Sequence, residues 1–250
     1  MELGLDNHVA VVTGASRGLG EAAVRALVAE GACVVAAARS VDALEALAGE
    51  LGDAVAAVPC DMRDRTGVAG LVDEAISRFG RLDSVVNNAG IAPASTFVSQ
   101  PDEVLDEVLA VNLAAPAALA RRAAHHWIGT GSPGSVINVA STSGLRGKPL
   151  LAAYSASKGG LLRLTEALAG EWARHRIRVN VIAPGAFETA AQSAVLDDPD
   201  TLSARLRRIP VRRMGLPDEI GPLVCYLASG LSAFVTGSCV VIDGGEVSKL

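Results

Sequence analysis

The 250-residue sequence is poor in aromatic residues and in cysteine, and it has no long run of basic residues. Phe, Trp and Tyr make up 3% of the chain while hydrophobic residues make up 50%, so the core must be built from aliphatic side chains. Only 20% of residues are charged, which argues against a disordered chain. Because the formal net charge is −5, we expect neither nucleic acid nor an anionic membrane as a partner.

Signals for secretion, membrane insertion and metal binding are also missing. The start, MELGLD, has no basic segment followed by an apolar one, and no stretch approaches the roughly 20 uninterrupted apolar residues of a membrane span. The four cysteines lie far apart, with no CxxC spacing. The adjacent His125 and His126 would point about 100° apart on a helix and could not chelate together. We therefore expect reduced thiols in a cytoplasmic protein and no metal site.

Short apolar runs alternate with helical patterns along nearly the whole chain. Strands are predicted at residues 8–13, 32–37, 54–59, 84–87, 136–140, 178–183 and 239–242. Helices are predicted at residues 21–30, 41–51, 66–79, 102–127, 154–175 and 217–228, with a candidate break near Asn112 and Pro116. Parallel strands need crossover connections, so this order predicts an α/β fold: a doubly wound, Rossmann-type parallel sheet of about seven strands with helices on both faces.

One long segment departs from this alternation. Residues 186–214 are polar and rich in arginine, and they separate the sixth predicted strand from the last helix. Connections of this length in compact domains are usually functional, and too little chain follows for a second core. We therefore expect residues 1–250 to form one domain in which residues 186–214 act as a substrate lid.

A glycine-rich turn, TGASRGLG at residues 13–20, lies directly between the first predicted strand and the first helix. Glycine permits a tight turn and lets backbone N–H groups approach a phosphate, while the helix N-terminus supplies partial positive charge. The turn is not a P-loop, because no Lys-Ser/Thr follows its last glycine. Since strand, spacing and helix agree, the turn predicts dinucleotide binding. The binding residues predicted here are Gly14, Ser16, Arg17, Gly18, Leu19 and Gly20.

At this point the sequence resembles the short-chain dehydrogenase/reductase family. The motifs that carry the resemblance span nearly the whole chain: TGASRGLG at 13–20, Asp61, NNAG at 87–90, Asn112, Ser141, YSASK at 154–158, PG at 184–185 and DGG at 243–245. The resemblance implies hydride transfer between a nicotinamide cofactor and a carbonyl or alcohol carbon of a small molecule. It also implies a homotetramer or a homodimer.

The residues after the second predicted strand indicate which nicotinamide cofactor is used. In doubly wound folds an acidic residue there accepts from the 2′-hydroxyl of NAD, whereas a basic residue suits the 2′-phosphate of NADP. Here the strand runs into Ala38-Arg39-Ser40 with no acid. Arg39 is either a solvated loop charge or the partner of the phosphate, assisted by Arg17 and Ser40. Because nothing there would repel the phosphate, we predict NADP(H).

The resemblance assigns further cofactor contacts. Asp61 matches the family aspartate that hydrogen-bonds the adenine amino group, with Met62 behind the base, although an aspartate at a strand end is also a common turn residue. Phe187 stands where the family more often has an aliphatic residue, so we expect a reshaped pocket. The other cofactor-binding residues implied are Asn88, Ala89, Gly90, Tyr154, Lys158, Pro184, Gly185, Phe187 and Thr189.

Tyr154 and Lys158 stand four residues apart on a predicted helix and so project from one face. A phenol with a pKa of about 10 is a poor base at neutral pH, and a nearby cation lowers that pKa. Such a pair is often only a surface pair, but here the flanking residues match the family's pattern. We therefore predict that Tyr154 is the acid/base for the oxygen of the hydride acceptor.

Two polar residues complete the predicted catalytic set of Asn112, Ser141, Tyr154 and Lys158. Ser141 ends the fifth predicted strand, where open α/β sheets bind ligands, so its hydroxyl is placed to hydrogen-bond the substrate oxygen. Thr142 and Ser143 would serve equally as turn residues, but the spacing to Tyr154 selects Ser141. Asn112 matches the family asparagine that interrupts its helix and helps a water join the relay to Lys158; it is alternatively only a helix-interruption residue.

The substrate is less well specified. Its predicted pocket walls are residues 93–97, residues 145–151 and the lid, whose arginines form either a solvated basic face or a site for an anionic substrate. The related enzymes considered are 3-oxoacyl-acyl-carrier-protein reductases, NAD-linked alcohol or sugar-acid dehydrogenases and other carbonyl reductases. Residues 125–132 lack the Lys or Arg that carrier-protein docking would use. A non-catalytic NADP-binding scaffold ranks lower, because Tyr154 and Lys158 are both present.

Overall fold

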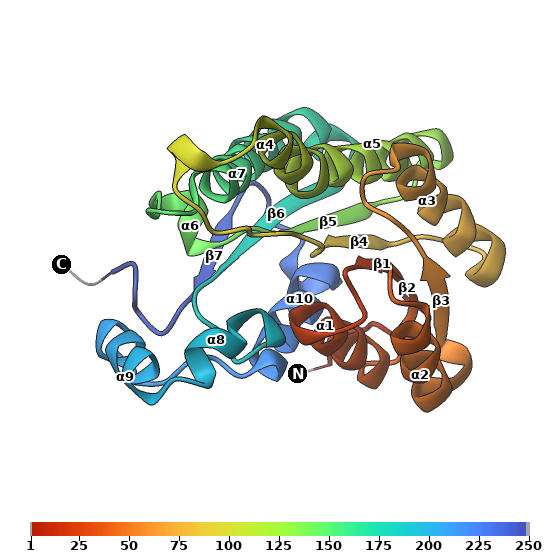
Figure 1. Ribbon diagram of the computed structural model, residues 1–250. Coiled ribbons are helices and arrows are strands. Elements are labelled where there is room, and N and C mark those ends of the chain that lie inside the picture. Colours follow the sequence, from red (N-terminus) through yellow and green to blue (C-terminus); the bar gives the residue numbers. More distant parts are fainter. Residues whose placement is uncertain (1, 249–250) are drawn as a thin grey trace.

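The computed structural model describes residues 2–248, whose strands form one seven-stranded sheet (Figure 1). The strands are β1 (Val9–Thr13), β2 (Cys33–Ala38), β3 (Val55–Pro59), β4 (Ser84–Asn87), β5 (Gly134–Val139), β6 (Ile177–Pro184) and β7 (Cys239–Ile242). They pair in parallel in the order β3-β2-β1-β4-β5-β6-β7. The chain changes direction across the sheet between β1 and β4, which is the point where doubly wound folds bind ligands.

Helices cover both faces of this sheet, as Figure 1 shows. One face is covered by α1 (Gly18–Ala29), α2 (Val41–Leu51) and α10 (Gly221–Ala228). The other face is covered by α3 (Arg65–Phe79), α4 (Asp102–Leu109), α5 (Ala115–Thr130) and α7 (Ala152–Trp172). Shorter helices are α6 (Thr142–Leu145), α8 (Ser193–Leu196) and α9 (Pro199–Arg208). Short 3₁₀ segments occur at Gly52–Ala54, Phe97–Ser99, Ala173–His175, Ala190–Gln192, Pro217–Ile220 and Gly230–Ser232. The predicted fold class is confirmed.

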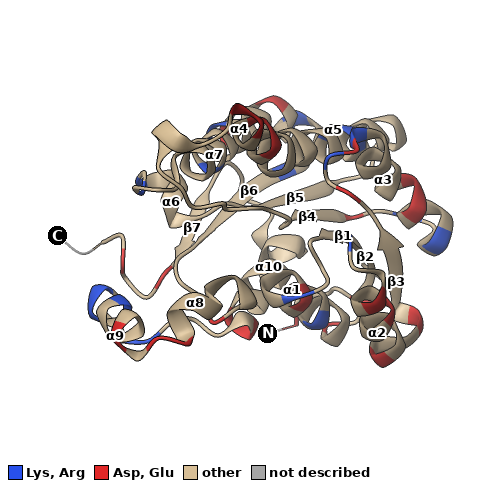
Figure 2. Ribbon diagram, viewed as in Figure 1, with Lys and Arg blue, Asp and Glu red and all other residues tan. Residues whose placement is uncertain are grey.

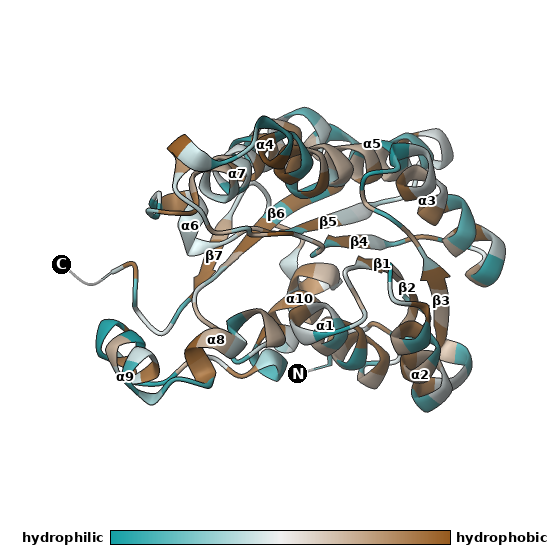
Figure 3. Ribbon diagram, viewed as in Figure 1, coloured by the Kyte–Doolittle hydropathy of each residue, from teal (hydrophilic) through white to brown (hydrophobic). Residues whose placement is uncertain are grey.

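The core consists of one apolar layer on each side of the sheet. In β1, Val9 and Val11 pack towards α3 and α5, while Ala10 and Val12 pack towards α1 and α10. Successive side chains of a strand point to opposite faces, so a strand covered on both sides must be apolar throughout. Figure 3 shows the brown, hydrophobic strands between helices whose outer surfaces are teal. None of the helices within residues 2–248 is long and apolar enough to cross a membrane.

The long helical region after β4 is interrupted where the sequence suggested. A single π-helical turn at Ala110–Ala114 joins α4 to α5, and Asn112 lies within it. Pro116 does not break the helix, because it occupies the first turn of α5, where a missing N–H costs nothing. The interruption of the helix is therefore at Asn112 rather than at Pro116.

Residues 186–214 form more regular structure than the sequence suggested. They contain α8 and α9 and carry a small core of their own, made by Ala186, Ile209 and Met214. Figure 1 shows α8 and α9 away from the sheet, with α9 farther out than α8 on the side where the chain ends. The few apolar side chains of this polar segment are spaced so that they pack on one another, which the excess of arginine obscures in the sequence.

Candidate active site

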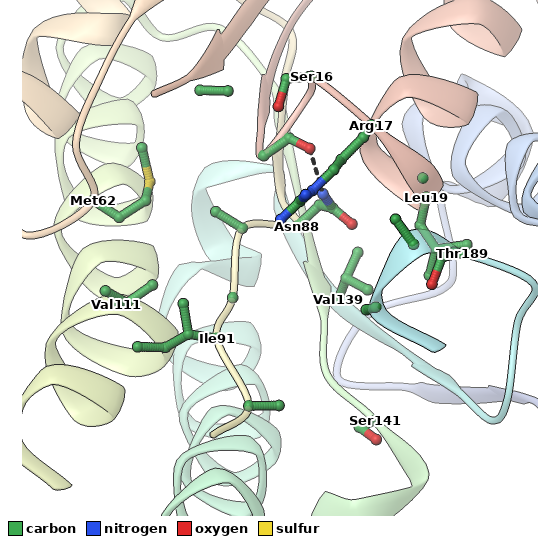
Figure 4. Close-up of a pocket in the computed structure, with 18 of the residues that line it drawn as sticks. Ser16, Arg17, Leu19, Met62, Asn88, Ile91, Val111, Val139, Ser141 and Thr189 are labelled. Carbon is green, nitrogen blue, oxygen red and sulfur yellow. Dashed lines mark hydrogen bonds between the residues drawn. The ribbon is translucent and has the colours of Figure 1, made fainter. Parts of the chain in front are cut away.

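A cavity of about 620 Å³ opens at the carboxyl ends of the central strands. Met62, Ile91 and Val111 lie on one side of it, opposite Leu19 and Thr189 (Figure 4). Of the predicted site residues, those that line the cavity are Gly14, Ser16, Arg17, Gly18, Leu19, Arg39, Ser40, Asp61, Met62, Asn88, Ala89, Gly90, Ser141, Tyr154, Lys158, Pro184, Gly185, Phe187 and Thr189. Gly20 and Asn112 do not line it. They lie behind the lining and shape it.

The glycine-rich turn brings the N-terminus of α1 to the cavity. The helix begins at Gly18, three residues earlier than predicted, and Arg17 at its N-cap makes no capping hydrogen bond with its side chain. The first N–H groups of the helix are therefore available to an anion. A Cβ at Gly20 would lie 2.2 Å from the Gly14 carbonyl oxygen, and one at Gly14 would lie 2.8 Å from the Ala89 Cα. Only glycine allows these approaches, so the turn fits the phosphates of a dinucleotide.

Asn88 holds this turn in place. Its side-chain amide donates to the Thr13 carbonyl at 2.9 Å and to the Gly14 carbonyl at 3.2 Å (Figure 4). The Thr13 hydroxyl accepts from the backbone N–H groups of Asn88 and Ala89, at 3.1 Å each. The end of β4 is thereby bonded to the end of β1. Asn88 lines the cavity and also fixes the loop that would receive the phosphates.

Asp61 has a partner that sequence reasoning missed. The Arg63 Nε lies 3.1 Å from Oδ1 and 3.0 Å from Oδ2 of Asp61, and the Arg63 backbone N–H donates to Oδ1 at 2.9 Å. These bonds from Arg63 lower the pKa of Asp61 to about 2, so the carboxylate stays charged. Arg63 also lies 3.6 Å from a Glu107 oxygen and lines the cavity. An arginine two residues after the predicted adenine-binding acid is the signal that could have revealed it.

The cations at this end of the cavity differ in their partners. Arg63 is ion-paired, whereas neither Arg17 nor Arg39 forms an ion pair within residues 2–248. Both line the cavity together with Ser40. Neither guanidinium group is held in an ion pair there, and Arg39 directly follows the end of β2. Other lining residues that the sequence did not single out are Ala38, Ala43, Cys60, Ile91, Ala92, Glu107, Val111, Val139 and Ala140. Ala190, Ala191 and Gln192 also line the cavity and belong to the predicted lid, whereas no residue of the predicted walls 93–97 and 145–151 lines it.

Tyr154, Lys158 and Ser141 come together at the other end of the cavity. The Tyr154 phenol interacts with Ser141, and the Lys158 Nζ lies 5.9 Å from the centre of the Tyr154 ring. The Lys158 ammonium donates to the Val139 carbonyl at 2.7 Å, and its side chain is 3% exposed. The Ser141 hydroxyl also accepts from the Ser143 N–H at 3.1 Å, which fixes its orientation. The helical spacing thus brings the phenol and the ammonium onto one face.

The prediction that Lys158 lowers the pKa of Tyr154 is wrong for the protein without a bound cofactor. Burial raises the pKa of the Tyr154 phenol, and its interaction with Ser141 lowers that pKa only in part. Burial also lowers the pKa of the Lys158 ammonium to about 8. Lys158 bonds to a backbone carbonyl of β5 instead of facing the phenol directly, so desolvation outweighs their attraction.

Asn112 ties three segments together beneath the cavity. Its Oδ1 accepts from the Ile91 N–H at 2.9 Å, and its Nδ2 donates to the Ile91 carbonyl at 2.9 Å and to the Ser157 hydroxyl at 3.1 Å. The side-chain amide is thus occupied by protein partners. A Cβ at Gly90 would lie 3.3 Å from the Asn112 Oδ1 and 3.4 Å from the Lys158 Nζ. The backbone of Gly90 therefore packs closely against both side chains.

The start of the lid closes one side of the cavity. Phe187 is 4% exposed, and its ring packs over Gly215, to which it is bridged. The Thr189 side chain approaches Gly18 of the glycine-rich turn. The unusual aromatic residue at 187 therefore does line the cavity, and it is held there by a glycine that leaves space for its ring.

The buried, unpaired Lys158 should cost the protein stability. Its pKa falls from 10.5 in the unfolded chain to about 8, a difference worth about 3 kcal/mol. Below pH 8 Lys158 is protonated in both the folded and the unfolded protein, so the full cost of burying its charge is present. Between pH 8 and 10.5 Lys158 is protonated only in the unfolded protein, so the free energy of unfolding rises with pH. We expect Lys158→Met to raise the free energy of unfolding at pH 7 by up to about 3 kcal/mol, with the gain shrinking towards pH 10.

Urea unfolding at several pH values measures this effect, with Arg163→Met as the control, because Arg163 is an exposed residue of the same helix. A Lys158→Met variant that is destabilised equally at all pH values would contradict the explanation.

A cleft for a dinucleotide in front of a Tyr–Ser–Lys cluster defines a nicotinamide-dependent oxidoreductase, and comparison with known proteins agrees. The family model described as enoyl-(acyl carrier protein) reductase matches residues 14–246. The chain belongs to the short-chain dehydrogenase/reductase family. It is an oxidoreductase that interconverts a carbonyl and an alcohol with a nicotinamide dinucleotide.

Its relatives act on varied substrates. It is 34% identical over 248 residues to 2-dehydro-3-deoxy-D-gluconate 5-dehydrogenase of Escherichia coli, covering 98% of this chain and 97% of the relative. It is 35% identical over 246 residues to a 3-oxoacyl-[acyl-carrier-protein] reductase of Thermotoga maritima, covering 97% and 99%. It is 40% identical over 249 residues to 3beta-hydroxysteroid dehydrogenase 1 of Eggerthella lenta, covering 96% and 94%.

Solved structures superpose over the whole chain. A putative short-chain alcohol dehydrogenase from Sinorhizobium meliloti has a TM-score of 0.94 at 35% identity, covering 100% of both chains. A gluconate 5-dehydrogenase from Burkholderia cenocepacia, in complex with NADP and tartrate, has a TM-score of 0.93 at 32% identity, covering 100% of this chain and 98% of the other.

Proposed function

We propose that this protein is an NADP(H)-dependent enzyme that interconverts a ketone and a secondary alcohol of a small molecule, with Tyr154 as the acid/base. The observation that carries the proposal is that Tyr154, Ser141 and Lys158 line the same cavity as the glycine-rich turn. A hydroxyl pair at the carboxyl end of β5 suits a polar oxygen of the substrate. The bound nicotinamide supplies the hydride in reduction and accepts it in oxidation.

In reduction, Tyr154 donates its proton to the carbonyl oxygen while Ser141 holds that oxygen by a hydrogen bond. The substrate gains a hydride at carbon and a proton at oxygen, and the phenolate regains its proton afterwards. Oxidation is the reverse. Lys158 stabilises the phenolate when it forms, because its ammonium is the nearby cation. Asn112 acts as a positioning residue that fixes Ile91 and Ser157, and by family resemblance it would order a water in the relay to Lys158.

Two observations support NADP(H) over NAD(H). Arg17 and Arg39 line the cavity and form no ion pair within residues 2–248, and the residues that directly follow β2, Arg39 and Ser40, are not acidic. A phosphate would pair with these guanidinium groups, and Ser40 would add a hydroxyl donor. Structures of related gluconate dehydrogenases contain NADP. In this proposal Asp61 and Met62 receive the adenine, and Pro184, Gly185, Phe187 and Thr189 receive the nicotinamide.

We further propose that residues 186–214 act as the substrate lid of one domain, that the enzyme is cytoplasmic, and that it forms a homotetramer or homodimer. Free cysteines fit a reducing compartment. The alternative activities are a 3-oxoacyl-acyl-carrier-protein reductase and an NAD-linked alcohol or sugar-acid dehydrogenase. The similarity to a sugar-acid dehydrogenase and to a 3-oxoacyl-[acyl-carrier-protein] reductase supports each of these alternatives. The absence of Lys and Arg from residues 125–132 argues against the reductase that acts on carrier proteins.

A panel of ketones assayed in parallel with NADPH and NADH tests the proposal. We expect NADPH oxidation with at least one small ketone, and a kcat/KM at least about tenfold higher with NADPH than with NADH, as expected for a charge-assisted phosphate contact. The purified protein without a carbonyl compound is the control for background oxidation. Tight NADPH binding with no turnover across the panel would favour the non-catalytic scaffold instead.

A further inference from the structure

Lys148 is a half-buried cation close to the catalytic serine that the proposed reaction does not use. It lies in the connection between α6 and α7, and its ammonium points inward to the hydroxyl of buried Thr142, the residue after Ser141, at 3.4 Å. That distance makes a weak contact, and it is the one hydrogen bond found for this ammonium within residues 2–248. The backbone N–H of Lys148 donates to the Ser155 hydroxyl at 3.2 Å, so the loop itself is held.

Charged side chains from two other elements face Lys148. Arg205 and Arg208 of α9 repel its positive charge, while Asp243 and Glu246 after β7 attract it. Figure 2 shows blue segments on α9 and next to α6, both on the side of the molecule where the chain ends. Three segments that are distant in sequence therefore meet around one ammonium: the loop after Ser141, the lid helix and the C-terminal turn.

The two acids of this cluster are already engaged by other groups. Both oxygens of Glu246 bind the Arg205 guanidinium, at 2.9 Å each, in a largely buried ion pair. The Asp243 carboxylate accepts from the backbone N–H groups of Gly245 at 2.8 Å and Val247 at 2.7 Å. Neither acid comes within 4.0 Å of the Lys148 ammonium, so no ion pair satisfies it in the described part of the chain.

A second donor in the same cluster is also unsatisfied. The Arg205 Nε is buried and has no hydrogen-bond partner among residues 2–248. A buried donor without an acceptor is costly, and such groups call for an explanation by function or by a ligand. Three cations face two acids whose oxygens are taken, so the cluster has an excess of positive charge and of N–H donors.

We propose that Lys148 binds a carboxylate group of the substrate, so that this enzyme acts on a keto acid or hydroxy acid. A carboxylate offers acceptor oxygens to the Lys148 ammonium and neutralises the excess charge of the cluster. The subsite adjoins Thr142 and hence Ser141, so a carboxylate bound there extends from the same molecule whose carbonyl meets Ser141 and Tyr154. This inference depends on the proposed function.

The test uses two ketones that differ only at one end. 5-Keto-D-gluconate carries a carboxylate, and L-sorbose has the same carbon chain and hydroxyl configuration with a CH₂OH group in its place. With NADPH, we expect the wild-type protein to prefer 5-keto-D-gluconate. Lys148→Met should raise the KM for it by about 30-fold with little change in kcat, and leave the KM for L-sorbose unchanged, as for the loss of a charged hydrogen bond.

The matched control is Arg146→Met, because Arg146 is an exposed cation of the same loop that forms no ion pair within residues 2–248. Equal effects of the two variants, or a preference for 5-keto-D-gluconate that survives Lys148→Met, would overturn the carboxylate subsite. So would a wild-type protein that turns over L-sorbose as well as 5-keto-D-gluconate, although the proposed function would then stand.

Direct binding separates the subsite from catalysis if neither sugar is turned over. Calorimetric titration of 5-keto-D-gluconate into the NADP⁺-loaded protein should give binding in the wild type and in Arg146→Met, and a loss of about 30-fold in affinity in Lys148→Met. No binding to the wild type would overturn the inference. Binding lost only in Lys148→Met, without turnover of any ketone, would support the subsite and count against the proposed reaction.

Discussion

Tyr154→Phe is expected to lower kcat by about 10³-fold with any ketone that the enzyme reduces, while NADPH binds as before. The ring stays in place, but the hydroxyl that supplies the proton is gone. Steady-state assays measure kcat, and the change in nicotinamide fluorescence on titration measures NADPH binding. Tyr226→Phe is the matched control, because Tyr226 is the second of the two tyrosines and lies on α10, outside the residues that line the cavity.

The pH dependence adds an independent check on the same residue. Burial raises the pKa of Tyr154, so the phenol holds its proton at neutral pH and is ready to donate it in reduction. Alcohol oxidation needs the deprotonated form, so its rate should increase as the pH rises from neutral, and Tyr154→Phe should abolish that increase. If Tyr154→Phe kept more than a tenth of the wild-type kcat, another group would have to be the acid.

Arg39→Asp is expected to reverse the cofactor preference. The new carboxylate would repel the 2′-phosphate and accept from the 2′-hydroxyl of NADH, so the Kd for NADPH should rise by about 100-fold while the Kd for NADH falls. Arg39 has no ion pair to lose among the described residues, so the change acts on the cofactor rather than on the fold. Fluorescence titration with each nucleotide gives both dissociation constants.

Arg63→Ala is the control for Arg39→Asp. Arg63 lines the same cavity but is bound to Asp61, so its loss should affect the binding of NADPH and NADH to the same extent. An Arg39→Asp protein that still prefers NADPH tenfold would show that the phosphate lies elsewhere or that Arg17 alone determines the preference.

Much of the fold could be predicted because its signals are local. The predicted bounds of β4 (Ser84–Asn87), β7 (Cys239–Ile242) and α2 (Val41–Leu51) agree with the structure. Strands buried on both faces must be apolar at every position, and the helices between them must be amphipathic, so the two patterns are easily told apart. The predicted start of α1 at residue 21 is too late, because Gly18 and Gly20 belong both to the glycine-rich turn and to the first turn of the helix.

Contacts between distant charged residues could not be predicted in the same way. Nothing in the sequence pairs Arg63 with Glu107, or Arg205 with Glu246, since these partners lie 44 and 41 residues apart and meet only in the folded chain. The pKa of Tyr154 is a further case. Helical spacing correctly brings Lys158 to the same face, but it says nothing about burial, which acts on both groups and decides the direction of both shifts.

The sequence by itself determined the parallel sheet, the glycine-rich turn and the neighbourhood of Tyr154, Lys158 and Ser141, because each depends on the period of a strand or helix or on a short spacing along the chain. The tertiary structure alone decided which charges are paired and which are left unsatisfied, including Lys148 and the Arg205 Nε. Hydrogen bonding and desolvation depend on distances in space between remote segments, and those distances exist only once the sheet has brought the loops at its carboxyl edge together.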